Sequence, residues 1–320
     1  MNRFKNILYV LNDQIKEPSA SLLRAVSLAK NNQADLTILY VLPKLSLSAR
    51  SKEIGIDEQK IQKNVVEHEE ANLHRLTASL DGAFQAKTEL RVGKKYIETI
   101  RAVKVNNFDL VVKEADEFSW LDRFLGSDDM HLLRKCPCPV WLLKKNEKPD
   151  YGHVMAAVDF DTEDDDSSND ELNTMIMDLA SSLSLSDFAS LHVVNAYDVP
   201  EAGFISLWVE QPDKVERELY ESEYRLRKYK MDRLLNDLKH KLGEESYKYL
   251  SPCPRIVQGI PGRELPKVAT SIKADLVVMG TVARTGIAGL VIGNTAETVL
   301  SQLQCSVLAI KPKDFVSPVT

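Results

Sequence analysis

The sequence predicts two tandem α/β domains, each with a mostly parallel five-stranded sheet and helices on both faces. Short valine-rich apolar runs alternate with helical patterns, the order typical of a parallel sheet. This order occurs twice: Asp109 aligns with Asp275, an offset of 166, and Val140 aligns with Val307, an offset of 167. So constant an offset indicates a duplication. The polar stretch 145–152 contains Pro and Gly and has the composition of a linker.

Each element of the first copy follows from its residue pattern. Apolar runs predict strands, and apolar residues on one face at 3.6-residue spacing predict helices. The predicted strands are Asn6–Leu11, Leu36–Val41, Ala86–Val92, Asp109–Val112 and Val140–Leu143. The predicted helices cover residues 19–31, 57–80 and 96–105.

The second copy repeats this order around a longer helical segment, about 212–241. Leu36–Val41 is aligned with Ala189–Val194. The predicted strands are His153–Val158, Ala189–Val194, Arg255–Val257, Asp275–Val278 and Val307–Lys311. We expect the domains to cover residues 1–145 and 152–320, as two domains suit a chain of this length.

Composition indicates a cytoplasmic globular protein without nucleic-acid or membrane partners. The 320 residues carry a net charge of −6, whereas nucleic-acid binders usually show a basic surface. No apolar run reaches the roughly 20 residues that span a bilayer. The apolar run that begins at Ile7 ends at Asn12 without a cleavage-site pattern, so we interpret it as a strand. Four cysteines do not make a disulfide framework.

One stretch, Gly280–Ala296, combines a buried strand end, a glycine-bearing loop and a helix start. Asn294 or Thr295 is expected to cap the helix, and Glu297 to lie in its first turn. Free N–H groups at a helix N-terminus favour an anion such as phosphate. The loop glycines allow close backbone approach to a ligand. An ordinary strand-to-helix connection is the alternative interpretation.

This loop resembles the nucleotide loop of the universal stress protein family. The family pattern is Gly, two residues, Gly, nine residues, Gly, then Ser or Thr. Gly280 and Gly293 fit the first and last glycine, whereas Ala283 replaces the second. Asn294 replaces the hydroxyl residue, and Thr295 follows one place later. The segment 131–142 is similar to the tandem, E-type branch of the family, and the resemblance covers nearly the whole chain.

The resemblance implies Rossmann-like domains of the adenine nucleotide alpha hydrolase type, with ATP as the cofactor. Ligands of such sheets lie beyond the carboxyl ends of the strands. The implied site consists of a strand-end aspartate near adenine and ribose, two valines expected to end the second strand, and loop residues around the phosphates. These residues are Asp159, Val193, Val194, Gly280, Thr281, Ala283, Arg284, Gly293, Asn294 and Thr295.

The first copy is predicted to be a degenerate half that binds no nucleotide. Glu114 and Glu117 stand where the second copy has Gly280 and Ala283. Asn12 replaces the strand-end aspartate. Carboxylates in this loop repel a triphosphate at short range.

Other clusters are assigned structural roles. Cys136 and Cys138 are separated by one residue, closer than usual zinc ligands, so structural thiols and no metal are predicted. His192 is expected to be structural or pocket-lining. The acidic stretch 161–170 lacks the glycine and distal glutamate of an EF-hand. No nucleophile elbow, His-Glu-x-x-His motif or Walker lysine indicates an enzyme.

The leading functional hypothesis is a non-enzymatic stress-tolerance protein with a ligand-sensing pocket for ATP or another adenine nucleotide in its C-terminal domain. One alternative is a binding module for an apolar or acyl ligand, indicated by Ala283 and by the apolar run 204–209. The other is weak ATP hydrolysis, for which no catalytic base is identified.

A small-molecule ligand and an internal partner are expected. Val140–Leu143 and Val307–Ile310 are short apolar strands, expected at sheet edges. Exposed apolar edges promote aggregation, so the two are predicted to pair in an internal pseudo-dimer, as family members pair between subunits. Further dimerisation is left open.

Overall fold

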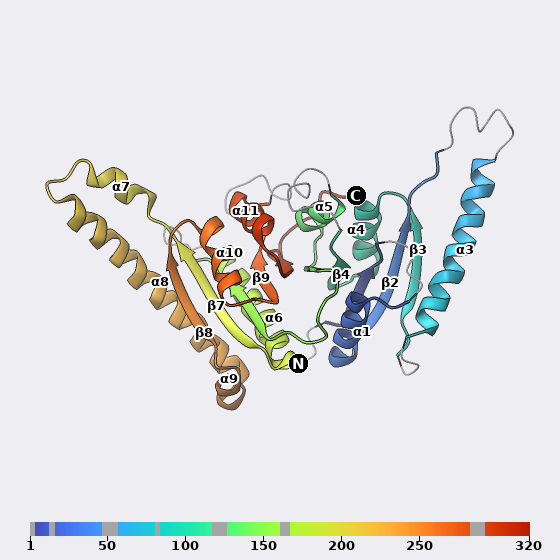
Figure 1. Cartoon of the computed structure of the whole chain (residues 1–320), viewed down its shortest axis with the longest axis horizontal. Coiled ribbons are helices and arrows are strands. Elements are labelled where there is room, and N and C mark those ends of the chain that lie inside the picture. Colours follow the sequence, from blue (N-terminus) through green and yellow to red (C-terminus); the bar gives the residue numbers. More distant parts are fainter. Residues whose placement is uncertain are drawn as a thin grey trace. The chain divides into compact units, whose positions relative to one another are not determined.

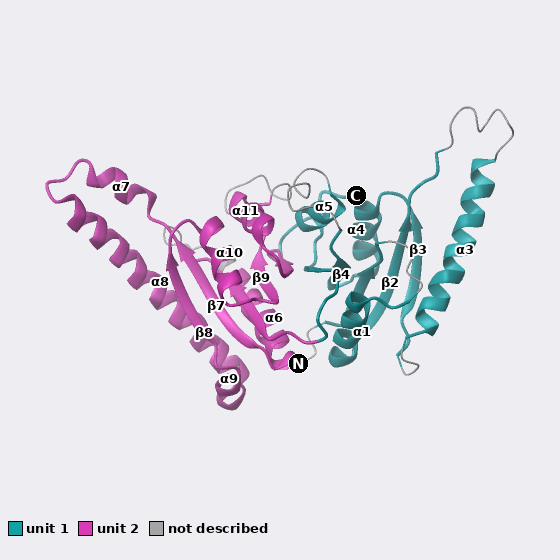
Figure 2. Cartoon of the chain, viewed as in Figure 1, with its two compact units in different colours: residues 1–149, 285–291, 314–320 teal, residues 150–284, 292–313 magenta. Residues whose placement is uncertain are grey.

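The computed structural model describes residues 4–12, 17–46, 57–80, 84–116, 127–160, 167–281 and 292–320, with side chains from 170 onward in the sixth range. The chain divides into two compact units (Figure 2). Unit 1 comprises residues 1–149, 285–291 and 314–320, and unit 2 comprises residues 150–284 and 292–313. The tail 314–320, which sequence analysis assigns to the second domain, therefore belongs to unit 1.

Unit 1 alternates strands and helices (Figure 1). Its described elements are β1 (Asn6–Val10), α1 (Ala20–Asn32), β2 (Asp35–Leu42), α3 (Glu58–Ala78), β3 (Lys87–Val92), α4 (Lys95–Asn106), β4 (Leu110–Glu114), α5 (Asp128–Lys135) and β5 (Val140–Leu143). The strands lie in the order β3-β2-β1-β4-β5, and every neighbouring pair is parallel.

Unit 2 repeats this arrangement with additional helices around β7. Its described elements are β6 (His153–Ala157), α6 (Ser167–Asp187), β7 (Ser190–Tyr197), α7 (Pro200–Ser206), α8 (Pro212–Leu242), α9 (Glu244–Leu250), β8 (Cys253–Gln258), α10 (Pro261–Ser271), β9 (Leu276–Gly280), α11 (Asn294–Gln302) and β10 (Ser306–Ile310). The order β8-β7-β6-β9-β10 is the same as in unit 1, and the pairs are parallel. The predicted α/β fold is confirmed in both units.

The central strands are buried on both faces, as the near-continuous apolar runs predict. In β1 and β4, Ile7, Leu8 and Leu110 are fully buried. In unit 2, Val154 on β6 and Val277 on β9 are fully buried as well. Helices must therefore pack on both faces of each sheet, because the strands carry apolar side chains on both faces.

The duplication extends to individual hydrogen bonds. The carboxylate of Asp109 accepts from the backbone N–H groups of Lys5, at 2.7 Å, and Asn6, at 3.2 Å. Asp275, its partner in unit 2, accepts from Gly152 at 2.8 Å and His153 at 3.1 Å. Both aspartates thus fasten the start of the first strand to the start of the fourth.

A glycine after the third strand is also repeated. Gly93 has φ 159°, within the extended range, whereas Gly259 has φ 131°, which L side chains rarely adopt. A Cβ atom on Gly259 would lie 2.8 Å from the Glu264 side chain, and one on Gly93 would lie 2.9 Å from that of Glu98. The tight approach of the following helix therefore requires glycine in both copies.

The structure corrects the end of the strand that lines the predicted site. β7 continues to Tyr197, so the prediction that it ends at Val194 is wrong. The Leu11 N–H donates to the Leu39 carbonyl in unit 1, and the equivalent Val158 N–H donates to the Val194 carbonyl in unit 2. Val194 is therefore equivalent to Leu39, which differs by two residues from the alignment predicted from sequence. A slip of two residues keeps every side chain on its face, so the apolar pattern does not reveal it.

In unit 1, α1, α3 and α5 begin with a side-chain cap, whereas α4 does not, and neither does α11 in unit 2. Ser127 caps α5 by accepting from the Met130 N–H at 3.2 Å. At α11 the N-cap residue is Gly293, and no side-chain cap bond is formed there. The prediction that Asn294 or Thr295 caps this helix is therefore wrong. Glu297 lies in the first turn as predicted.

Candidate ligand-binding site

Unit 2 contains a cavity of about 490 Å³ at the carboxyl ends of β6, β7 and β9, within the size range of small-molecule sites. Helices α6, α8, α10 and α11 complete its wall. Its lining is formed by Ala157, Val158, Asp159, Leu172, Asn173, Ile176, Ala196, Tyr197, Asp198, Pro200, Arg227, Pro261, Leu265, Met279, Gly280, Gly293, Asn294, Thr295 and Ala296. The predicted location beyond the strand ends agrees with this cavity.

One end of the cavity is the N-terminus of α11. The first intrahelical bond runs from the Glu297 N–H to the Gly293 carbonyl, at 2.9 Å. The N–H groups of Asn294, Thr295 and Ala296 precede it, and these residues line the cavity. Such N–H groups and the helix dipole favour an anion.

Just after β6, the cavity wall is polar, and the amide side chain of Asn173 holds the backbone there by two hydrogen bonds. The Asn173 side chain on α6 accepts from the Asp159 N–H at 3.1 Å and donates to the Asp159 carbonyl at 2.6 Å. Asn173 itself is 2% exposed, whereas Asp159 is exposed. These two bonds fix the turn after β6 and leave the Asp159 side chain at the cavity edge.

Arg227 on α8 lines the cavity and was not anticipated from sequence. Its guanidinium bonds Glu223 at 2.6 Å and donates to the Phe160 carbonyl at 3.1 Å and the Asn195 amide oxygen at 3.4 Å. It also lies 5.2 Å from the centre of the Tyr197 ring. These contacts occupy the guanidinium, so Arg227 joins α8 to the ends of β6 and β7.

The cavity brings together half of the predicted site residues. Asp159, Gly280, Gly293, Asn294 and Thr295 all line it.

The remaining predicted residues lie elsewhere. Val193 and Val194 are fully buried within β7, and the cavity is lined instead by Ala196 and Tyr197 farther along the strand. Thr281 is also buried, and it does not line the cavity. Ala283 and Arg284 lie outside the described residues.

The two glycines that fit the first and last glycine of the loop pattern have different surroundings. A Cβ atom on Gly280 would lie 2.7 Å from the Leu172 side chain of α6, so glycine there makes room for the helix that lines the cavity. Gly293 has φ −64° and ψ 142°, which any residue adopts. Gly293 therefore provides space at the helix start and no special backbone angle.

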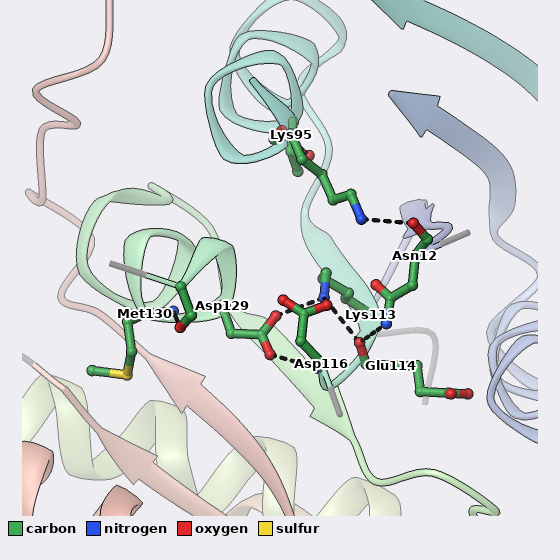
Figure 3. Close-up of polar contacts among 9 residues, drawn as sticks. Asn12, Lys95, Lys113, Glu114, Asp116, Asp129 and Met130 are labelled. Atoms are coloured by element: carbon green, nitrogen blue, oxygen red, sulfur yellow. Dashed lines mark hydrogen bonds and ion pairs between the residues drawn. The ribbon is translucent and has the colours of Figure 1, made fainter. Parts of the chain in front are cut away.

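In unit 1 the equivalent location holds a charge network (Figure 3). Lys113 and Glu114 on β4 occupy the places of Met279 and Gly280. The Lys113 ammonium bonds Asp116 and Asp129, each at 2.7 Å, and donates to the Glu114 carbonyl at 3.0 Å.

The network centres on a buried lysine shared by two carboxylates. The Lys113 side chain is fully buried, and that of Asp129 is 5% exposed. Asp129 also accepts from the Asp116 N–H at 2.9 Å. Two carboxylates near this loop, Asp116 and Asp129, are therefore paired with a lysine that the sequence pattern did not indicate. Glu117, expected from sequence to repel phosphate, lies outside the described residues.

Neighbouring polar residues complete this arrangement. The Asn12 side chain donates to the Glu114 carbonyl at 2.7 Å, and Lys95 donates to the Asn12 carbonyl at 2.7 Å. The Glu114 carboxylate accepts from the Ser21 hydroxyl at 2.6 Å. Asn12 and Lys95 stand where the cavity of unit 2 has Asp159 and Pro261. Unit 1 thus fills with its own polar groups the positions that line a cavity in unit 2.

The cysteine pair predicted to be structural lies at the end of α5. The sulfur atoms of Cys136 and Cys138 are 3.6 Å apart, and both residues are buried. Nearby His131 stacks on Tyr96 at 4.2 Å. Burial and the charges of Lys135 and Arg134 lower the pKa of His131. Among the described residues, no three His, Cys, Asp or Glu side chains are grouped to hold a metal.

The acidic stretch 161–170 mostly lies outside the described residues; its last residue, Asp170, pairs with Arg233 at 2.6 Å. No helix in the described part of the chain has the length and apolar character needed to cross a membrane.

Comparisons with known proteins agree with the fold and its duplication. A family model described as the universal stress protein family matches residues 3–144 and again 150–311. A universal stress protein E homolog from Haemophilus influenzae is 31% identical over 322 residues, covering 97% of this chain and 98% of the relative. Universal stress protein E from Photorhabdus laumondii is 27% identical and covers 100% of this chain and 98% of the relative.

Solved structures show the same fold at full length. A protein of unknown function from Pseudomonas aeruginosa has a TM-score of 0.64 at 24% identity, covering 98% of this chain and 95% of that one. A universal stress protein from Archaeoglobus fulgidus has a TM-score of 0.63 at 17% identity, with 97% of both chains covered.

The chain belongs to the universal stress protein family. Its two matched segments make it a tandem member, and the full-length relatives named above carry the name universal stress protein E. The resemblance of the chain to this branch of the family is thereby confirmed.

Proposed function

We propose that this chain is a stress-tolerance protein that senses a small molecule by binding an adenine nucleotide, ATP in the first instance, in the cavity of unit 2. The observation that supports it most is the combination within one cavity of the uncapped α11 N-terminus with apolar walls. An anionic phosphate group suits the helix N-terminus, and an adenine ring suits the apolar walls. No catalytic step is part of the proposal.

The nucleotide would lie along the length of the cavity. Its phosphates would accept from the N–H groups at Asn294–Ala296, and its base would lie near Ala196 and Ile176. Asp159, at the exposed edge, would accept from ribose hydroxyls. Unit 1 offers no comparable place, since Lys113 and Asp129 already satisfy each other there.

Titration calorimetry with ATP on the full chain tests the proposal. We expect one nucleotide per chain, because the Lys113 network occupies the equivalent positions in the described part of unit 1. In Gly293→Val the branched side chain would enter the phosphate end, and binding is expected to be lost. Gly243→Val, at a glycine outside the cavity lining, is unsuitable as a control because its φ of 81° strains any side chain. Gly203→Val, with nothing within 4 Å of an added Cβ, is the matched control.

Two nucleotides per chain, or full affinity in a folded Gly293→Val variant, would contradict the assignment. Weak ATP hydrolysis, the remaining enzymatic alternative, is tested in the same samples by measuring phosphate release over time.

A non-nucleotide ligand is the second candidate, supported by the largely apolar lining around Leu172, Leu265 and Met279. An apolar or acyl ligand would be retained through purification. Mass spectrometry of the small molecules released on denaturation distinguishes the candidates: a nucleotide supports the first, and a lipid supports the second.

A further inference from the structure

A second surface of unit 2, on α7 and the first half of α8, is acidic. Between residues 198 and 227 there are eight acidic and four basic residues, an excess of four acids. The whole chain has 47 acidic and 41 basic residues, an excess of six. This segment therefore carries most of the net negative charge of the chain.

The segment also exposes large apolar side chains. On and just after α7, Phe204 is 66% exposed, Leu207 is 76% exposed and Trp208 is 78% exposed. The rings of Phe204 and Trp208 lie 6.4 Å apart and form a small aromatic cluster. Of the residues on α7, only Ala202 is fully buried within the described structure. These three residues of the apolar run 204–209 therefore lie on the surface and not in the core.

A hollow of about 640 Å³ lies beside α8 in the same segment. Tyr197, Tyr220 and Tyr224 contribute aromatic surface to it, and Asp213 and Glu216 contribute carboxylates. Arg217 also lines it, as does the ion pair of Glu221 with Arg225, at 3.8 Å. Both acids are exposed, and within the described residues neither forms a salt bridge. The hollow thus offers apolar rings beside carboxylates that lack an ionic partner in the described chain.

The placement of this segment leaves it accessible. In Figure 1 the first half of α8 extends past the carboxyl ends of β7 and β8, and α7 lies beside it. α7 packs chiefly through Tyr197, Val199 and Ala202, a small cluster with Leu219 and Tyr220 at its margin. The opposite side of α7, with Leu207 and Trp208, is the exposed one.

Charge decides which kind of partner this surface suits. An anionic lipid surface or a nucleic acid would be repelled by an excess of four acids. A basic segment is attracted to it, and apolar side chains on that segment can cover exposed aromatic residues, which are favoured as interface anchors. Arg and Lys side chains also bind well over tyrosine and tryptophan faces.

We propose that α7 and the first half of α8 form a docking surface for a basic segment of a partner protein that carries apolar side chains. Phe204, Leu207 and Trp208 bury its apolar side chains, and Asp213 and Glu216 pair with its basic groups. This proposal does not depend on nucleotide binding in the cavity.

Fluorescence anisotropy with a labelled model peptide tests it. The probe is a peptide of about 15 residues with Lys and Leu at helical spacing, and its counterpart carries Glu for every Lys. We expect the lysine peptide to bind, with an affinity that falls as salt is raised, and the glutamate peptide not to bind. Trp208→Asn should weaken binding about tenfold or more, as is usual for an anchor residue. Asp213→Asn combined with Glu216→Gln should weaken it about fivefold and reduce the salt dependence.

Matched controls lie elsewhere on unit 2. Phe188→Asn removes an aromatic residue that is 79% exposed, close to the exposure of Trp208. Glu245→Gln removes an exposed acid on α9. Both should bind the lysine peptide like the original chain.

Three results would overturn the proposal. The first is no binding of the lysine peptide by the unchanged chain, and the second is equal binding by Trp208→Asn. The third is sedimentation with phosphatidylglycerol vesicles that depends on Trp208, since this would assign the surface to lipid.

Discussion

The carboxyl ends of β4 and β9 are the same place in two copies of one fold, yet they are built in opposite ways. At the end of β9, Met279 and Gly280 leave room for a cavity. At the end of β4, Lys113 and Glu114 fill that room with an ammonium group and a carboxylate. Unit 1 pairs Lys113 with Asp116 and Asp129, whereas under the proposal above the N-terminus of α11 in unit 2 receives a ligand. Under that proposal, a duplicated chain keeps one binding site and turns the other into structure.

The largest effect is expected from a test of whether the two copies unfold together. Leu308→Glu places a carboxylate in the fully buried β10, which costs several kcal/mol. If β5 and β10 pair as the sequence predicts, unit 1 should be destabilised with unit 2, and thermal unfolding should show one transition at a lower temperature.

Two separate transitions, with that of unit 1 unchanged, would show that the copies are independent. Ser301→Glu, at a position only partly buried on α11, is the control for an added charge in unit 2.

Next in size is removal of the buried cation of unit 1. Lys113→Met copies the residue of unit 2 but leaves Asp129 buried without its cation. Breaking a buried pair in this way costs about 3–5 kcal/mol, measurable by urea unfolding. Met279→Leu in unit 2 exchanges residues of similar volume and should cost less than about 1.5 kcal/mol.

Asp129→Ala added to Lys113→Met should restore part of the stability. A cost for Lys113→Met below that of Met279→Leu would mean that the network contributes nothing to folding.

A smaller effect is expected when the charge of unit 1 is introduced into unit 2. Thr295→Asp places a carboxylate in the first turn of α11, where it favours the helix dipole. The same carboxylate would repel a bound phosphate, by about 3 kcal/mol at 5 Å with an effective dielectric constant of about 20. Stability should therefore rise slightly while ATP affinity falls at least tenfold in calorimetry.

Asn236→Asp, exposed on α8, adds the same charge away from the cavity and should leave ATP affinity unchanged. Equal ATP affinity in Thr295→Asp would place the phosphates away from α11.

The smallest effect concerns His192, which unit 1 replaces with Thr37. Burial, and secondarily Arg255 and His153, lower the pKa of His192. His192 therefore takes up a proton more readily in the unfolded chain than in the folded one. The contribution of neutral His192 to folding stability is complete above the unfolded pKa of about 6.5, and it is lost as pH falls through the lower folded pKa.

His192→Gln should therefore reduce the difference in urea midpoint between pH 7.5 and pH 5.5, two values chosen on either side of about 6.5. His240→Gln, exposed on α8, should leave that difference as it is. An unchanged difference in His192→Gln would exclude this histidine as a source of the pH dependence.

Most of the fold could be predicted from the sequence because both copies carry the same apolar runs. The aspartates Asp109 and Asp275 form the same hydrogen bonds in both copies, and the offset of 166 between them differs by only one from that between the last strands. The end of β7 could not be placed, because a two-residue slip changes no face of the strand. Ala196 and Tyr197 were therefore missed as cavity residues.

The candidate site was only half predictable, because its polar contacts join distant segments. Lys113 lies on β4 directly after the apolar residues of that strand, and nothing in the neighbouring sequence indicates that it will pair with Asp129. Arg227 lies on the long helix α8, where the family resemblance is weakest. Its partner Phe160 follows β6, and its partner Asn195 lies on β7.

The tail of the chain has a consequence for the order of events during synthesis. Residues 314–320 belong to unit 1, where the carbonyl of Thr320 accepts from Arg101 at 3.0 Å and that of Val319 accepts from Lys104 at 2.8 Å. These residues leave the ribosome after all of unit 2. Domains generally fold as they emerge, the N-terminal one first. Here unit 1 emerges first, but its last segment, residues 314–320, emerges only after unit 2. Arg101 and Lys104 on α4 therefore lack these tail contacts until the second domain has been translated.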